Sequence, residues 1–374
     1  MKPAMVSRAG RCLADLGITV LALHDLRNMM QDGLLARVCS SPAVEAVRVP
    51  APCGGELPAD LYLPAARGQH GGLVLVPGFT PQGKDDPRIV WLARVVARIG
   101  FVVLVPDLPG LRSLQARESD VEGMIGCFRF LTEQRARVRP DRVGLMGISY
   151  GAGPTVIAAA DPSIAECVHF VLSLGGYYDL VDVISFVTTG HFAWKGHQGC
   201  IPPSPHARGR FLLANLDLVR DRRDQEILER VAQGFLNGGG ELPVPPGALS
   251  PWGGALLSLL LNGNPDRVRP LVEELDPRVR ERIAYLSPAR VINRVRAHLL
   301  IIHGIEDDFI PFTESLRLAA AAPDPSRVRL AITRLVTHVD VVRPEGRSPA
   351  KVGTLFGDVW RMFRVVQFAV AQRR

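Results

Sequence analysis

The pentapeptide Gly147-Ile148-Ser149-Tyr150-Gly151 decides the fold, because it stands where a short apolar run meets a stretch of small residues. The preceding run, 142–146, predicts a buried strand, and the alanine-rich stretch 152–160 predicts a helix. A serine between two glycines at a strand-to-helix turn takes strained backbone angles that hold its hydroxyl above the sheet. The pattern therefore predicts that Ser149 is displayed as a nucleophile.

Buried strands and amphipathic helices alternate on both sides of this turn. Besides 142–146, the apolar pattern predicts strands at 44–49, 57–63, 72–76, 101–105, 169–174, 298–302 and 328–335. One predicted helix begins at Pro87, which suits a first helical turn, and ends at Gly100, which suits a C-cap. The alternation predicts an α/β fold with a mainly parallel sheet flanked by helices on both faces.

The alternation is interrupted once, which predicts three parts in the chain. We expect a helical extension at 1–43 and a mostly helical insertion at 187–286. The α/β core is expected to consist of 44–186 and 287–374. An insertion between two strands of an open α/β sheet usually lies over their carboxyl ends, where ligands bind. We therefore expect a cap over the functional site.

Composition excludes several other classes of function. The net charge is +7, but the basic residues are mostly arginines interleaved with acidic residues, so nucleic-acid binding is not expected. Six scattered cysteines with no C-x-x-C pair argue against a zinc site and a disulfide framework. No apolar run approaches the ~20 residues of an integral membrane span, and a cytoplasmic location is favoured. The apolar stretch 16–23 leaves a signal peptide or peripheral membrane association open.

A nucleophilic serine needs a histidine as base and a carboxylate that orients the histidine. In an α/β sheet of this kind the three follow the chain order serine, acid, histidine. The strand predicted at 298–302 leads into the acidic cluster 306–308, and the next strand leads into His338. His338 is the only histidine after that cluster, so we predict that it is the base.

The acidic cluster also carries a longer pattern, H-G-x-x-D-x-x-(V/I)-P, matched by His303, Gly304, Asp307, Ile310 and Pro311. In this pattern the chain resembles α/β-hydrolases related to dienelactone hydrolases and to acyl-peptide-type esterases and peptidases. The resemblance covers 44–186 and 287–374. It implies that Asp307 is the acid, in preference to Asp308 or Glu306, and that His303 supports the loop.

An oxyanion hole needs two backbone N–H groups. One is expected from Tyr150, which follows the nucleophile, and the other from the loop after the strand at 72–76. Similar hydrolases carry His-Gly in that loop, whereas this chain has Pro77-Gly78. We predict Phe79 as the second donor, with Thr80 as the alternative and as a substrate contact. Aromatic residues of the insertion are candidate pocket walls, although they could equally be core: Phe186, Phe192 and Trp194.

These residues predict a serine hydrolase with a triad of Ser149, His338 and Asp307. The expected partner is a small-molecule acyl substrate, with a carboxylic ester favoured over an amide. The chemistry requires neither a metal nor a cofactor. An acyltransferase on the same fold and a peptidase of the prolyl-oligopeptidase type remain as alternatives. A non-catalytic binding protein is the least favoured reading.

Overall fold

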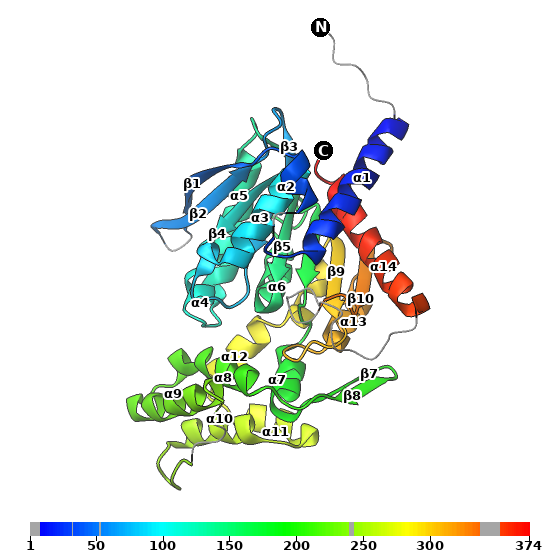
Figure 1. Cartoon of the computed structure of the whole chain (residues 1–374). Helices are drawn as coiled ribbons and strands as arrows, with labels where there is room; N and C mark the ends of the chain where they lie inside the picture. The colour runs from blue at the N-terminus through cyan, green and yellow to red at the C-terminus, as the bar shows by residue number, and fades with distance from the viewer. Residues whose placement is uncertain (1–7, 32, 52–53, 239–242, 337–351) are drawn as a thin grey trace.

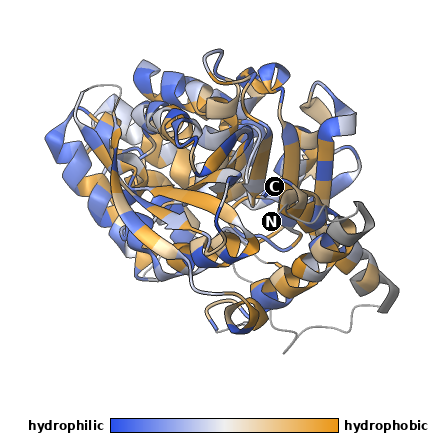
Figure 2. Cartoon of the chain, turned by 90° about the horizontal axis from the view of Figure 1, so that it is seen from above, coloured by the Kyte–Doolittle hydropathy of each residue, from blue (hydrophilic) through white to orange (hydrophobic). Residues whose placement is uncertain are grey.

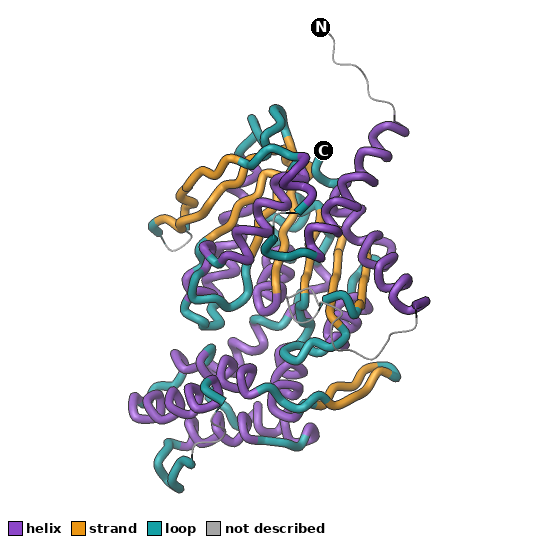
Figure 3. Tube along the Cα trace, viewed as in Figure 1, coloured by secondary structure: helices purple, strands orange, loops and turns teal. Residues whose placement is uncertain are grey.

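The computed structural model describes residues 8–31, 33–51, 54–238, 243–336 and 352–374, and its centre is an eight-stranded sheet (Figures 1 and 3). The strand order is β1-β2-β4-β3-β5-β6-β9-β10. The strands are β1 (Ala43–Pro50), β2 (Glu56–Leu63), β3 (His70–Val76), β4 (Phe101–Pro106), β5 (Val138–Ile148), β6 (Phe170–Leu174), β9 (His298–Gly304) and β10 (Val328–Thr333). Each predicted strand is present, with its ends shifted by a few residues.

The sheet is mainly parallel. β1 and β2 pair in antiparallel fashion, as do β2 and β4, and every other neighbouring pair is parallel. Every residue of β4 is buried, and in β3 only the first residue is not. Continuous apolar strands of this kind are typical of parallel sheets that are covered on both faces. Figure 2 shows hydrophobic residues concentrated along these central strands.

Helices cover both faces, as predicted. One face is packed by α5 (Glu118–Glu133), α6 (Ala152–Ala159) and α13 (Phe312–Ala321). The other carries α1 (Arg8–Arg27), α2 (Leu34–Val38), α3 (Pro87–Ile99) and α14 (Val352–Ala371). The short α4 (Pro109–Arg112) follows β4. As predicted, α3 begins at Pro87 and ends at Gly100, whose φ of +115° is a left-handed C-cap.

The chain between β6 and β9 forms a separate layer beyond the carboxyl ends of the strands (Figure 1). It contains α7 (Leu180–Thr189), β7 (His191–Trp194), β8 (His197–Cys200), α8 (Pro205–Leu213), α9 (Arg222–Leu236), α10 (Pro251–Leu261), α11 (Val268–Glu273) and α12 (Pro277–Tyr285). We call residues 180–286 the cap. Its own apolar core includes Ile184 of α7.

The two ends of the cap lie side by side. The backbone N–H of Leu180, at the start of α7, donates to the Ser287 hydroxyl oxygen at 3.0 Å. The buried Glu314 carboxylate of α13 accepts the preceding N–H groups, from Tyr178 at 3.0 Å and Asp179 at 2.8 Å. Both connections of the cap are therefore fixed to the core at one place. In the part of the chain that the structure describes, no helix has the length and apolar character needed to cross a membrane.

Candidate active site

Ser149 lies in a strained turn directly after β5, the central strand between β3 and β6. Its φ is +53°, a left-handed value that is unfavourable for any residue with a side chain. The flanking glycines are needed sterically. A Cβ on Gly147 would lie 2.5 Å from the Thr155 hydroxyl oxygen, and one on Gly151 would collide with the Pro77 carbonyl oxygen. The turn thus has the geometry that the pentapeptide predicts.

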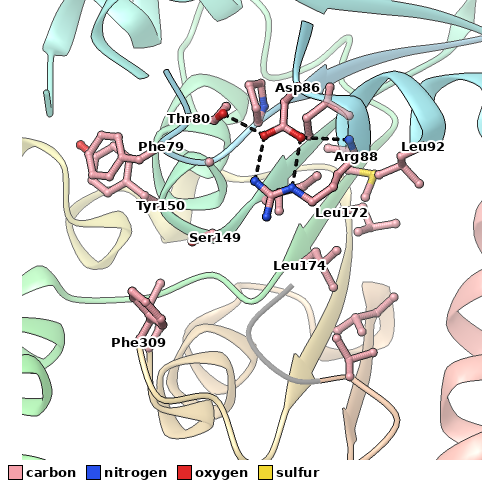
Figure 4. Close-up of a pocket in the computed structure, with 18 of the residues that line it drawn as sticks. Phe79, Thr80, Asp86, Arg88, Leu92, Ser149, Tyr150, Leu172, Leu174 and Phe309 are labelled. Carbon is pink, nitrogen blue, oxygen red and sulfur yellow. Dashed lines mark hydrogen bonds and ion pairs between the residues drawn. The ribbon is translucent and has the colours of Figure 1, made fainter. Parts of the chain in front are cut away.

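The loop after β3 passes directly beside this serine. A Cβ built on Gly78 would lie 3.1 Å from the Ser149 Cβ, so a larger residue there would press on the nucleophile. The rings of Phe79 and Tyr150 stack on each other (Figure 4). Their centroids are 4.1 Å apart. The Thr80 N–H already donates to the Leu111 carbonyl oxygen at 3.3 Å. That bond leaves Phe79 as the better candidate for the second oxyanion donor.

A buried carboxylate anchors this loop. Asp86, only 2% exposed, accepts the Thr80 hydroxyl at 2.8 Å and two guanidinium hydrogen bonds from Arg88, at 2.8 and 3.1 Å (Figure 4). It also caps α3 by accepting the Arg88 N–H at 2.9 Å. Burial alone would raise the pKa of Asp86, but hydrogen bonds from Arg88 and Thr80 outweigh it and lower the pKa to about 2. Sequence reasoning missed this network, although an aspartate before a proline is a recognisable helix N-cap.

Asp307 is fixed in the loop that follows β9. Its side chain is buried, and one carboxylate oxygen accepts the N–H groups of Phe309 and Ile310, both at 2.9 Å. The neighbouring acids, Glu306 and Asp308, are exposed. The backbone of the loop therefore holds the Asp307 carboxylate in a fixed orientation.

His303, near the end of β9, contacts the loop that holds Asp307. Its Nε2 lies 2.9 Å from the Ile310 carbonyl oxygen and 3.3 Å from an Asp307 carboxylate oxygen. Its Nδ1 lies 2.7 Å from the Ser315 hydroxyl oxygen. Because the carbonyl can only accept, Nε2 is a proton-bearing donor. The ring is fully buried, and these contacts agree with a supporting role.

His338 lies outside the described residues. The chain leading toward it is described as far as Val336. β10 pairs in parallel with β9, with Thr333 opposite Gly304, and the Ile305 N–H donates to the Thr333 carbonyl oxygen at 2.9 Å. The ends of these two strands therefore lie together at the edge of the sheet where the Asp307 loop begins.

A cavity of about 970 Å³ opens at Ser149, and we call it the Ser149 cavity. Phe79, Thr80 and Tyr150 line it beside the nucleophile, and the cap contributes α7 and α8. Most lining side chains are apolar, including Leu172 and Leu174 of β6. Among the described residues, no group of three or more His, Cys, Asp or Glu side chains could hold a metal ion.

The three cap aromatics considered as pocket walls are not among the described residues that line the cavity. α7 turns Val183 and Val187 toward the cavity, while Phe186 is buried on another face of the helix, against Phe192. Phe192 packs in turn on Phe312, with ring centroids 5.6 Å apart. Trp194 lies on the β7–β8 hairpin, with the Lys195 amine 4.9 Å from its ring centroid. Contacts within the cap and with Phe312 of α13 thus occupy these rings.

Comparison with known proteins gives partial matches. No protein-family model matches the chain. The bis(hydroxyethyl) terephthalate hydrolase of Streptomyces coelicolor is 32% identical over 114 residues, which cover 29% of this chain and 35% of that protein. The match thus spans only about a third of that relative.

The solved structures extend the comparison to most of the chain. An acylaminoacyl peptidase in complex with Z-Gly-Gly-Phe-chloromethyl ketone matches with a TM-score of 0.50 and 16% identity, over 82% of this chain and 39% of that one. The uncomplexed acylaminoacyl peptidase of Pyrococcus horikoshii has a TM-score of 0.49, with the same identity and coverage. At this identity the likeness concerns the fold. Together, the strand order, the turn at Ser149 and this likeness identify the chain as a protein of the α/β-hydrolase fold.

Proposed function

We propose that this chain is a serine hydrolase that cleaves a carboxylic ester through an acyl-enzyme intermediate. The observation that carries the proposal is the left-handed backbone of Ser149, at the carboxyl end of the central strand and in the wall of the large cavity. Such a conformation costs a serine stability, and strain of this kind is typical of residues that are displayed for chemistry.

In the proposed reaction, the Ser149 hydroxyl oxygen attacks the ester carbonyl while His338 takes its proton. Asp307 orients His338 and stabilises its protonated form. The N–H groups of Tyr150 and Phe79 stabilise the tetrahedral oxyanion. His338 then protonates the leaving alcohol, and a water molecule activated by His338 releases the acyl group as a carboxylic acid. No metal ion or cofactor takes part.

Three features support these assignments. Asp307 is the buried member of its acidic cluster and is held by two backbone N–H groups. The end of β10, which leads toward His338, lies beside the end of β9. The engaged N–H of Thr80 favours Phe79 as an oxyanion donor.

The apolar lining of the cavity supports an organic acyl substrate. An ester is favoured because the curated relative that matches part of the chain is named as a hydrolase of bis(hydroxyethyl) terephthalate, which is an ester. Peptide cleavage and acyl transfer, the alternatives from the sequence, are distinguished by their products. An acyltransferase yields a new ester when an alcohol is added, whereas a hydrolase yields the free acid.

The test combines covalent labelling with turnover. A fluorophosphonate probe should label the wild-type chain at Ser149, and a panel of 4-nitrophenyl esters from acetate to decanoate should be hydrolysed. Ser149→Ala should lose both signals. Ser163→Ala, which alters an exposed serine outside the cavity, is the matched control and should keep both. A wild-type chain that is not labelled and turns over no ester would refute the proposal.

A further inference from the structure

The charges that line the Ser149 cavity are unevenly matched. The charged residues among its lining are Arg27, Asp86, Arg88, Arg210, Arg282 and Asp308. Arg88 is paired with Asp86, and Arg282 binds both carboxylate oxygens of Asp217, at 2.8 and 2.9 Å. Arg27 and Asp308 are exposed, so water solvates them. Arg210 is the remaining charged residue of this lining.

Arg210 is a partly buried cation on α8, in the layer above the nucleophile. Its Nη1 atom is buried and has no hydrogen-bond partner, and within the described part of the chain no carboxylate lies within ion-pair distance. Arg208, two residues earlier, differs because its guanidinium donates to the Thr188 carbonyl oxygen. Arg208 thus has a packing role inside the cap, whereas Arg210 faces an open cavity.

A guanidinium N–H that is buried without a partner, as at Nη1 of Arg210, is costly, and arginine cannot relieve that cost by losing its proton. Burial lowers the pKa of Arg210, and the positive charge of Arg88 lowers it further, so its surroundings disfavour the cation. An anion that entered the cavity would remove this penalty. The neighbouring lining is mostly apolar, so the complementary ligand is an apolar molecule with a single negative charge.

We propose that Arg210 binds a free carboxylate on the substrate, so that the chain prefers esters that also carry a carboxylic acid group, such as half-esters of dicarboxylic acids. The planar guanidinium matches a carboxylate with two parallel hydrogen bonds. A phosphate monoester would bring a second charge that the cavity leaves unpaired. This inference rests on the proposed ester hydrolysis and names its substrate class.

The test compares two phenyl esters of equal chain length, monophenyl glutarate and methyl phenyl glutarate, by release of phenol at pH 7.5. The first carries an ionised carboxylate and the second a neutral methyl ester. Wild-type kcat/KM should favour the acid by about ten- to a hundredfold, the range expected for hydrogen bonds between charged groups. Arg210→Gln should bring the ratio near one, and Arg210→Lys should retain part of it. Arg230→Gln removes an exposed cap arginine outside the cavity and should leave the ratio unchanged.

A binding experiment separates this inference from the proposed function. Calorimetric titration of Ser149→Ala should give a Kd for monophenyl glutarate about tenfold or more below that for the methyl ester, and adding Arg210→Gln should abolish the difference. Ester turnover without any preference for the acid would overturn the role of Arg210 and leave the hydrolase intact. Absence of turnover with a binding preference that depends on Arg210 would overturn the hydrolase and leave the carboxylate site. Equal binding of both esters would overturn the inference directly.

Discussion

Asp86→Asn tests the ion pair between Asp86 and Arg88, which anchors the loop after β3 that carries Phe79. Asparagine keeps the shape of the side chain and can still cap α3, but it cannot form an ion pair with Arg88. The substitution therefore imitates protonated Asp86. The pKa falls from 3.8 to about 2 in the folded chain, and a difference of about two units corresponds to about 2.5 kcal/mol. Because the Arg88 side chain is 49% exposed, solvent screening reduces the expected loss of unfolding free energy to about 1–2 kcal/mol.

The pH dependence has a definite sign. Because folding lowers the pKa of Asp86, its charge stabilises the folded state fully above about pH 4, and the contribution is lost as the pH falls through about 2. Urea unfolding should therefore show the full gap between wild type and Asp86→Asn at pH 7 and roughly half of it at pH 3. Asp141→Asn, at an ion-paired aspartate that is 63% exposed, is the control and should cost less than about 0.5 kcal/mol. An Asp86→Asn gap that is absent at pH 7, or unchanged at pH 3, would refute this reasoning.

Three further substitutions test the site. Asp307→Asn should lower kcat for 4-nitrophenyl acetate by about a thousandfold or more, while Asp308→Asn should change it less than about threefold. Steady-state kinetics measure both effects. The reverse pattern would assign the role of triad acid to Asp308. Gly151→Ala should lower the midpoint of thermal unfolding and abolish fluorophosphonate labelling, because its Cβ collides with the Pro77 carbonyl oxygen. Leu174→Trp narrows the cavity and should lower the ratio of decanoate to acetate ester turnover severalfold, whereas an unchanged ratio would show that the acyl chain lies elsewhere.

Local sequence patterns were sufficient for the sheet and for the serine turn. The parallel strands are continuous apolar runs, which are recognisable in the sequence. Gly147 and Gly151 mark positions where neighbouring atoms lie too close for a Cβ. The Asp307 loop was also recognisable, because its pattern includes the histidine that supports it. The assignment of Asp307, His338 and the oxyanion donors to catalysis stays a prediction.

The cap was less predictable because its contacts are long-range. The apolar residues of α7 are spread over more than one face of the helix, so its sequence could not show that Val187 faces the cavity while Phe186 packs inside the cap. The β7–β8 hairpin was missed within a region predicted as helical. The sequence of its turn did carry a signal, because Gly196 suits the positive φ that a tight hairpin turn requires and that both Lys195 and Gly196 adopt. Arg210 could not be singled out among so many arginines until the partners of the others were known.

The adjacent ends of the cap have a consequence for how this molecule can change. Since the Leu180 N–H donates directly to the Ser287 hydroxyl oxygen, the whole layer between them leaves and rejoins the core at a single point. An insertion attached in this way can change in length or sequence without requiring a change in the order of the strands. Arg210 lies on the exchangeable part, whereas Ser149 and Asp307 lie on the constant part. The proposed nucleophile and the proposed carboxylate-binding residue thus lie on separate stretches of the chain, so that one stretch can change in sequence while the other is kept.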